Sequence, residues 1–90
     1  MTILGKDITV GTELLWLVEN GTYYKETREV IRTVESITLT PDYDYADAIM
    51  TFTYEYPHKH QWFILFDKEY KTADEFQNRF WLDGDPNNPL

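Results

Sequence analysis

The pattern of apolar and polar residues predicts a β-hairpin near the start of the chain. Residues 14–18 form an apolar run, and Asn20 and Gly21 follow it. An Asn-Gly pair between apolar segments is typical of a type I′ turn, because both residues tolerate a positive φ. We therefore expect residues 13–34 to form a hairpin that turns at Asn20-Gly21.

A two-residue turn would also fix the register of this hairpin. It would place Trp16 opposite Lys25, and Glu13 opposite Arg28 as an opposite-charge pair worth about 0.2–1 kcal/mol. Side chains alternate across a strand, so one face, the expected core face, carries Leu14, Trp16 and Val18. The other face carries Leu15, Leu17 and Tyr24. Because that face is also partly apolar, the pattern favours a sheet that curls on itself.

The long second arm of the hairpin changes phase. Val34 lies on one side of a regular strand, and Ile37, three residues later, lies on the other. A strand that keeps both side chains inward needs an extra residue, so we expect a β-bulge or tight bend at Glu35-Ser36. Such a bend allows a small sheet to close on itself.

A second hairpin is predicted after an irregular loop at residues 41–47. Apolar and polar residues alternate over residues 48–56, which predicts a strand. Its expected core side chains are Met50, Phe52, Tyr54 and Tyr56. Residues 57–60 are expected to turn, and the apolar run 61–66 predicts a central strand.

The pattern changes to helical spacing after this hairpin. Phe76 and Phe80 are four residues apart, and Thr72 with Glu75 has the spacing of a capping box. We therefore expect a helix over residues 73–81. The predicted fold class is mainly β (β-rich α+β), either a small barrel or a strongly curled antiparallel sheet of about five strands with one C-terminal helix.

Aromatic residues supply most of the predicted core. They make up 17% of the chain, and each buried ring removes about 150–250 Å² from water. With the helix packed over an open sheet face, the expected core includes Trp62, Phe63, Phe66, Phe76, Phe80 and Trp81. The alternative is an exposed aromatic patch used for docking or dimerisation.

Length and charge narrow the classes of function. The 90 residues predict a single domain, residues 1–90, with a flexible tail at 85–90. The net charge of −8 disfavours direct binding of nucleic acid or of an anionic membrane and favours basic partners. The chain has no cysteine and begins without a signal-peptide pattern, so we expect a cytoplasmic protein.

One segment combines acidic residues with tyrosine. Residues 33–58 contain no Lys or Arg. Carboxylates spaced along such a segment can imitate nucleic-acid phosphates, and Tyr adds contact area of the kind enriched at interfaces. The alternative is a solvated acidic face. The predicted partner-binding residues are Glu35, Asp42, Tyr43, Asp44, Tyr45, Asp47 and Glu55.

Other chemistry has little support in the sequence. The acidic segment lacks the glycine of a calcium loop, and the ligand-like residues 83–87 are not followed by a twelfth position. No third ligand joins His58 and His60 at zinc-site spacing. The single serine is in no nucleophile motif, and the four glycines form no phosphate loop. We therefore expect no metal site, no cofactor and no enzymatic activity.

Several segments resemble known small β-barrels. The residues are Val10-Gly11-Thr12, Leu15-Trp16-Leu17-Val18, Asn20-Gly21, the arm 29–34 and Lys68-Glu69-Tyr70. Together they resemble the SH3-like barrels, including small accessory proteins of bacteriophages. The resemblance covers about residues 8–70 and implies a binding module.

These observations lead to three alternative functions. The first is a phage-type inhibitor, acting in the host cytoplasm, that captures a basic, nucleic-acid-binding surface of a host or defence protein. The second is a structural or assembly subunit that oligomerises through Leu15, Leu17 and Tyr24. The third is a small-ligand binder that uses Tyr54, Tyr56 and Trp62.

Overall fold

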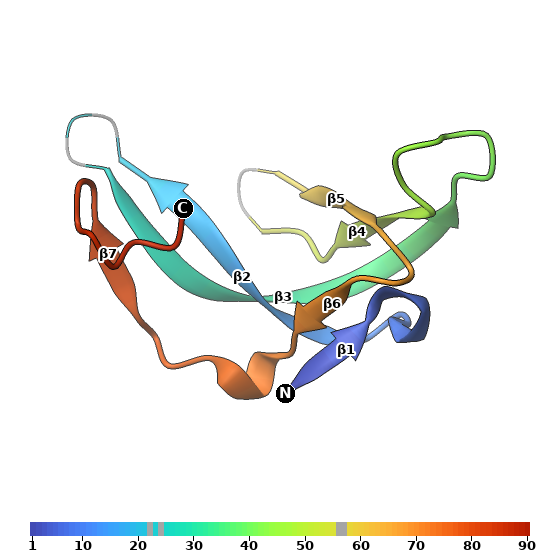
Figure 1. Cartoon of the computed structure of the whole chain (residues 1–90), viewed down its shortest axis with the longest axis horizontal. Coiled ribbons are helices and arrows are strands. Elements are labelled where there is room, and N and C mark those ends of the chain that lie inside the picture. The colour runs from blue at the N-terminus through green and yellow to red at the C-terminus, as the bar shows by residue number, and fades with distance from the viewer. Residues whose placement is uncertain (22, 24, 56–57) are drawn as a thin grey trace.

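The computed structural model describes residues 1–21, 23, 25–55 and 58–90 and consists mainly of antiparallel β-strands (Figure 1). The main sheet has the order β2-β3-β4-β5, and β7 pairs with β3 outside this path. A second sheet pairs β1 with β6. The bounds are β1 Thr2–Leu4, β2 Glu13–Asn20, β3 Glu26–Leu39, β4 Ala48–Phe52, β5 Gln61–Ile64, β6 Glu69–Lys71 and β7 Phe80–Leu82.

The main sheet curls into a half-barrel because β3 bends. The first half of β3 pairs with β2 and its second half pairs with β4. Between Val34 and Ser36 the register with β4 shifts by one residue, which leaves Glu35 as the extra residue of a bulge. The predicted bulge is confirmed, and it lets both Val34 and Ile37 face the core.

The predicted register of the first hairpin is wrong. Trp16 lies opposite Val30 and Asn20 lies opposite Glu26, so the connection spans residues 21–25. Gly21 has a φ of 100°, whereas Asn20 stays in the strand. The observed register pairs the apolar Trp16 with an apolar residue, where the two-residue turn would have set it against Lys25. Cross-strand packing therefore prevails over the local turn preference of Asn-Gly.

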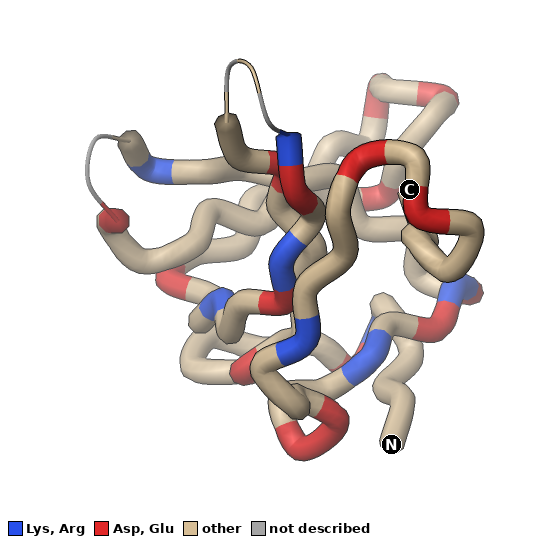
Figure 2. Tube along the Cα trace, turned by 90° about the vertical axis from the view of Figure 1, so that its left-hand side faces the viewer, with Lys and Arg blue, Asp and Glu red and all other residues tan. Residues whose placement is uncertain are grey.

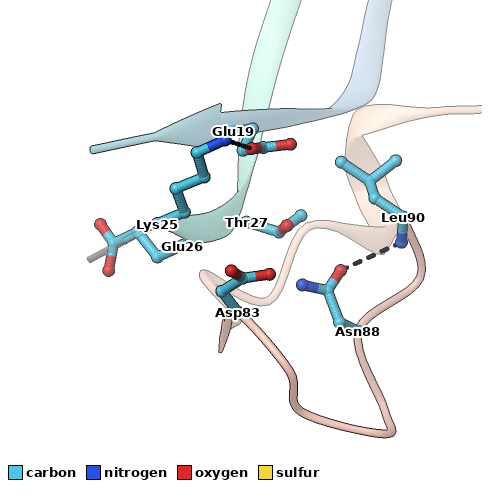
Figure 3. Close-up of a pocket in the computed structure, with 7 residues that line it drawn as sticks. All are labelled: Glu19, Lys25, Glu26, Thr27, Asp83, Asn88 and Leu90. Atoms are coloured by element: carbon cyan, nitrogen blue, oxygen red, sulfur yellow. Dashed lines mark hydrogen bonds and ion pairs between the residues drawn. The ribbon is translucent and has the colours of Figure 1, made fainter. Parts of the chain in front are cut away.

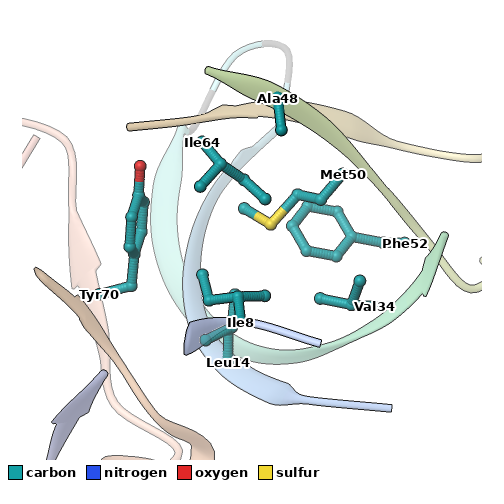
Figure 4. Close-up of a cluster of buried hydrophobic side chains, with 8 residues drawn as sticks. All are labelled: Ile8, Leu14, Val34, Ala48, Met50, Phe52, Ile64 and Tyr70. Atoms are coloured by element: carbon teal, nitrogen blue, oxygen red, sulfur yellow. The ribbon is translucent and has the colours of Figure 1, made fainter. Parts of the chain in front are cut away.

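The core fills the concave side of the half-barrel (Figure 4). It comprises Ile8, Leu14, Val34, Ala48, Met50, Phe52, Ile64 and Tyr70. The prediction of Met50 and Phe52 as core residues is confirmed. The same prediction for Tyr54 is wrong, because this residue follows the end of β4 and is 60% exposed. Tyr24 and Tyr56 lie outside the described residues.

The structure describes every residue from 73 to 81, and the predicted C-terminal helix is absent from this segment. The segment contains the short 3₁₀ turn η2 (Ala73–Glu75) and then the strand β7. Asn78 adopts a φ of 55°, which an α-helix does not allow. The helical spacing of Phe76 and Phe80 was therefore misleading, since Phe80 is 53% exposed and lies against Arg28. No helix among the described residues is long and apolar enough to cross a membrane.

A buried carboxylate explains why the chain extends here. Glu29 of β3 is 4% exposed, and its Oε1 accepts hydrogen bonds from the backbone N–H groups of Gln77 (3.1 Å) and Arg79 (2.9 Å). Its Oε2 accepts two more from the Arg79 guanidinium, at 3.0 and 2.7 Å. These four bonds fix residues 77–79 beside β3 and direct β7 onto its edge.

The same contacts perturb the titration of Glu29. The hydrogen bonds from the Arg79 guanidinium lower the pKa of Glu29 from 4.5 to about 2, although burial opposes this shift. The pKa of Arg79 is raised by the same hydrogen bonds. Glu29 is therefore ionised in the folded protein at every pH above about 2, and its ionised form stabilises the fold.

The C-terminal residues fold back against the β2–β3 hairpin (Figure 3). The N–H of Asp83 donates to the carbonyl of Lys25 at 3.0 Å, and the N–H of Leu90 donates to Oδ1 of Asn88 at 3.0 Å. A cavity of about 80 Å³ remains between the tail and the hairpin, with Lys25 and Glu19 paired across 3.6 Å at its side. This cavity is too small for most organic ligands, which occupy clefts of about 300–1,000 Å³.

Replacing Glu29 tests the role of this carboxylate. We expect Glu29→Gln to lower the free energy of unfolding by roughly 2–3 kcal/mol at neutral pH, because an amide cannot hold all four donors or pair with Arg79. The difference from the wild type should be complete above pH 4.5 and disappear as the pH falls towards 2. Urea unfolding at several pH values measures it, with Glu13→Gln on the exposed start of β2 as the control. A pH-independent difference would contradict this account.

Candidate functional site

The predicted loop between β3 and β4 exists and is anchored at its base. We call residues 40–47 the acidic loop. The Thr40 side-chain hydroxyl donates to the carbonyl of Ala46 at 3.0 Å, and the Thr40 N–H donates to the carbonyl of Asp47 at 3.0 Å. Ala46 is buried, so both ends of the loop are fixed against the core. The segment 42–45 projects from this base.

Asp47 belongs to the anchor. Its Oδ2 accepts a hydrogen bond from the Phe66 N–H at 2.8 Å, and its own N–H donates to the carbonyl of Ile64 at 2.9 Å. These bonds attach the acidic loop to the end of β5. One oxygen of the Asp47 carboxylate is thus already used within the protein.

Aromatic rings form a cluster beside the acidic residues. The ring of Tyr43 lies 5.4 Å from that of Phe63 on β5 and 5.5 Å from that of Tyr45, measured between centroids. Their exposed fractions are 43% for Tyr43, 45% for Phe63 and 79% for Tyr45. Phe63 was expected in the core, and this expectation is wrong because its side of β5 faces away from Ile64. The cluster presents apolar surface to solvent next to the loop.

Asp42 and Asp44 are the two exposed carboxylates of the loop whose oxygens accept no hydrogen bond from a described residue. Neither forms an ion pair with any of the residues placed by the structure. The acidic positions as a whole are distributed around the chain (Figure 2). Asp42 and Asp44 differ from most of the others in lying beside an exposed aromatic cluster.

Two predicted residues are not joined to the loop. Glu35 pairs with Lys59 at 3.1 Å, and Glu55 pairs with the buried Arg32 at 2.7 Å. The expectation that the acidic segment lacks compensating cations is therefore wrong at both positions. Arg32 and Lys59 lie just outside the base-free stretch, and the fold brings them back onto it. A continuous row of carboxylates that imitates phosphates is not assembled.

The arrangement is suited to binding. The rings of His58 and His60 have centroids 6.3 Å apart, and no described group of three or more potential metal ligands comes together. Carboxylates next to partly exposed rings supply charge and flat contact area, which are the features of a protein-binding surface. The residues brought together are Asp42, Tyr43, Asp44, Tyr45 and Asp47, with Phe63 added by the structure.

A second concave surface was not foreseen. A groove of about 720 Å³ lies along β2 and is bounded by β5, β6, β7 and the C-terminal tail. All three tryptophans of the chain, Trp16, Trp62 and Trp81, line it. Leu15 and Leu17, expected to form an oligomer interface, lie in the same groove, and Leu15 is only 8% exposed. The walls come from distant segments, so no local sequence signal indicated the groove.

Comparisons of the chain with protein-family models, with curated proteins and with solved structures find no match.

Measurements of the free energy of unfolding distinguish Asp47, which anchors the acidic loop, from the exposed Asp42 and Asp44. We expect Asp47→Ala to lower the free energy of unfolding by about 1–2 kcal/mol, because the Phe66 N–H loses its charged acceptor. The double variant Asp42→Asn/Asp44→Asn should change it by less than about 0.5 kcal/mol, since these carboxylates accept no hydrogen bond from a described residue. Thermal or urea unfolding provides both values. Equal losses in the two variants would show that the loop is not anchored through Asp47.

Proposed function

We propose that this protein is a non-enzymatic binding module that contacts a basic protein surface through the acidic loop. The observation that supports the proposal is the position of Asp42 and Asp44 beside the ring cluster of Tyr43, Tyr45 and Phe63. Carboxylates attract a basic partner at long range, and exposed rings add contact area once it docks. Neither feature is needed for the core.

The anchored base of the loop favours this use. Hydrogen bonds at Thr40 and Asp47 hold the two ends of the acidic loop together. A partner that binds a loop already held in place pays less conformational entropy than one that must order it. The loop is therefore better suited to recognition than a disordered acidic tail of the same composition would be.

The net charge of −8 defines the class of partner. A chain of this charge repels nucleic acid and is drawn to proteins with basic surfaces. The proposed partner is a nucleic-acid-binding protein of a host or of its defence systems, because the groove or patch that contacts phosphates in such a protein is basic. The proposal does not require phosphate mimicry along the whole segment, because Glu35 and Glu55 are engaged with Lys59 and Arg32. It requires only the local surface of the acidic loop.

A matched pair of charge reversals tests the proposal. The probe is a fluorescently labelled ten-residue peptide of alternating arginine and glycine, followed by fluorescence anisotropy at low salt. We expect Asp42→Lys/Asp44→Lys to weaken binding about tenfold or more, because the local attraction becomes repulsion. The control Glu13→Lys/Asp83→Lys changes the net charge equally at exposed positions, the start of β2 and the residue after β7, that lie away from the loop, and it should weaken binding about threefold or less.

The aromatic part of the surface gives an independent comparison. Tyr45→Ala should weaken binding several-fold without changing the net charge, whereas Tyr54→Ala, at another exposed tyrosine, should not. If the two charge reversals have equal effects and Tyr45→Ala has none, the peptide senses only the overall charge of the protein. That result would rule out the acidic loop as the binding site.

A further inference from the structure

The half-barrel has an open seam between its two edge strands. β2 and β5 stand at opposite ends of the strand order, and they are not paired with each other along their described lengths. The contact between them is aromatic: the ring of Trp16 on β2 lies 5.6 Å from that of Trp62 on β5. The 720 Å³ groove follows this seam, and its volume is within the range of ligand-binding clefts, about 300–1,000 Å³.

The backbone of β2 directs hydrogen-bonding groups into the groove. The N–H of Val34 donates to the carbonyl of Thr12, so the even-numbered residues of β2 point their backbone groups towards β3. The odd-numbered residues Leu17 and Glu19 then point theirs towards the free edge. Among the described residues no strand or isolated bridge pairs with β2 on this side at either position, and both residues line the groove.

The start of this edge already shows that it accepts another segment. Leu14 forms an isolated antiparallel bridge with Thr72, just after β6. The edge beyond Leu14, from Trp16 to Asn20, carries no such bridge among the residues that the structure places. It also lacks the proline and lysine residues that commonly protect exposed edges. Apolar side chains flank it on both sides, at Leu17 and Trp16.

The charged residues on the wall of the groove opposite β2 indicate which class of ligand the groove binds. Lys68 and Lys71 line the groove from the β6 side and form no ion pair with a described residue. The Lys68 ammonium lies 5.3 Å from the ring centroid of Tyr70. Three glutamates line the groove as well: Glu19 and Glu29 pair with Lys25 and Arg79, and Glu69 has no ion pair with a described residue. The unpaired charges of the lining, Lys68, Lys71 and Glu69, thus sum to +1 on a chain of net charge −8, so a ligand with negative side chains is repelled less here than over the surface as a whole.

From these features we infer that the groove binds an extended acidic peptide segment of another protein by strand addition to the free edge of β2. The peptide backbone pairs with Leu17 and Glu19, its apolar side chains pack on Trp16, and its acidic side chains, which alternate with them, face Lys68 and Lys71. This site is separate from the acidic loop and selects the opposite charge, so its test does not depend on the function proposed above.

The probe is a fluorescein-labelled ten-residue peptide of alternating valine and glutamate, measured by anisotropy and by amide chemical shifts of the full chain. Saturable binding is expected, with downfield shifts of the Leu17 and Glu19 amides as they gain acceptors. Lys68→Glu/Lys71→Glu should weaken binding about tenfold or more, whereas Lys6→Glu/Lys59→Glu, with the same change of charge at residues that do not line the groove, should weaken it about threefold or less.

Two changes isolate the backbone pairing. Leu17→Pro removes the outward N–H without breaking a bond to β3, and it should weaken binding at least about fivefold more than Leu17→Ala, which keeps the N–H. A peptide N-methylated at every second residue makes the same test from the ligand side if Leu17→Pro does not fold. The inference is overturned if no saturable binding appears up to millimolar peptide, or if N-methylation leaves the affinity unchanged. It is also overturned if sedimentation shows a dimer of the wild type that Leu17→Pro converts to a monomer, because a second copy of the chain would then occupy the β2 edge.

Discussion

The architecture depends on the pairing of one strand, β3, with three others. Within its 14 residues, all but Glu35 pair with β2, β4 or β7, and the bulge at Glu35 lets the same strand take part in both walls of the half-barrel. Because β4 and β7 occupy opposite ends of the same edge of β3, the acidic loop and the C-terminal tail are kept apart (Figure 1). The bend that closes one side of the core also leaves the seam between β2 and β5 open.

A long-range contact completes this arrangement at the other end of β3. Glu29 holds residues 77–79 with four hydrogen bonds and thereby sets the path of β7 and of the tail behind it. The guanidinium of Arg79 lies 5.6 Å from the ring of Trp81, which forms part of the groove wall. A buried carboxylate on the central strand therefore shapes the surface that we assign to a peptide ligand. The acidic loop is fixed separately, by Thr40 and Asp47.

Features that follow from side-chain parity could be predicted from the sequence. The phase change between Val34 and Ile37 identified the bulge. Alternation over residues 48–56 identified Met50 and Phe52 as core, but it wrongly included Tyr54. The hairpin register could not be predicted, because the local preference of Asn20-Gly21 yields to pairing along all of β2. The prediction of a helix over residues 73–81 is wrong for a similar reason. The carboxylate that accepts the N–H groups of Gln77 and Arg79 and holds residues 77–79 extended belongs to Glu29, some 50 positions away. For the candidate site, the composition of the sequence identified the acidic loop. The ion pairs of Glu35 with Lys59 and of Glu55 with Arg32, and the groove along β2, depend on tertiary contacts and could not be predicted.

Amide hydrogen exchange on the free protein tests most directly whether the β2 edge is open. The open seam predicts slow exchange at Trp16 and Val18, whose N–H groups point towards β3, and fast exchange at Leu17 and Glu19, whose N–H groups point into the groove. Alternation of this kind along one strand is the expected result. Uniform slow exchange from Trp16 to Glu19 would show that the edge is already paired and would contradict the account.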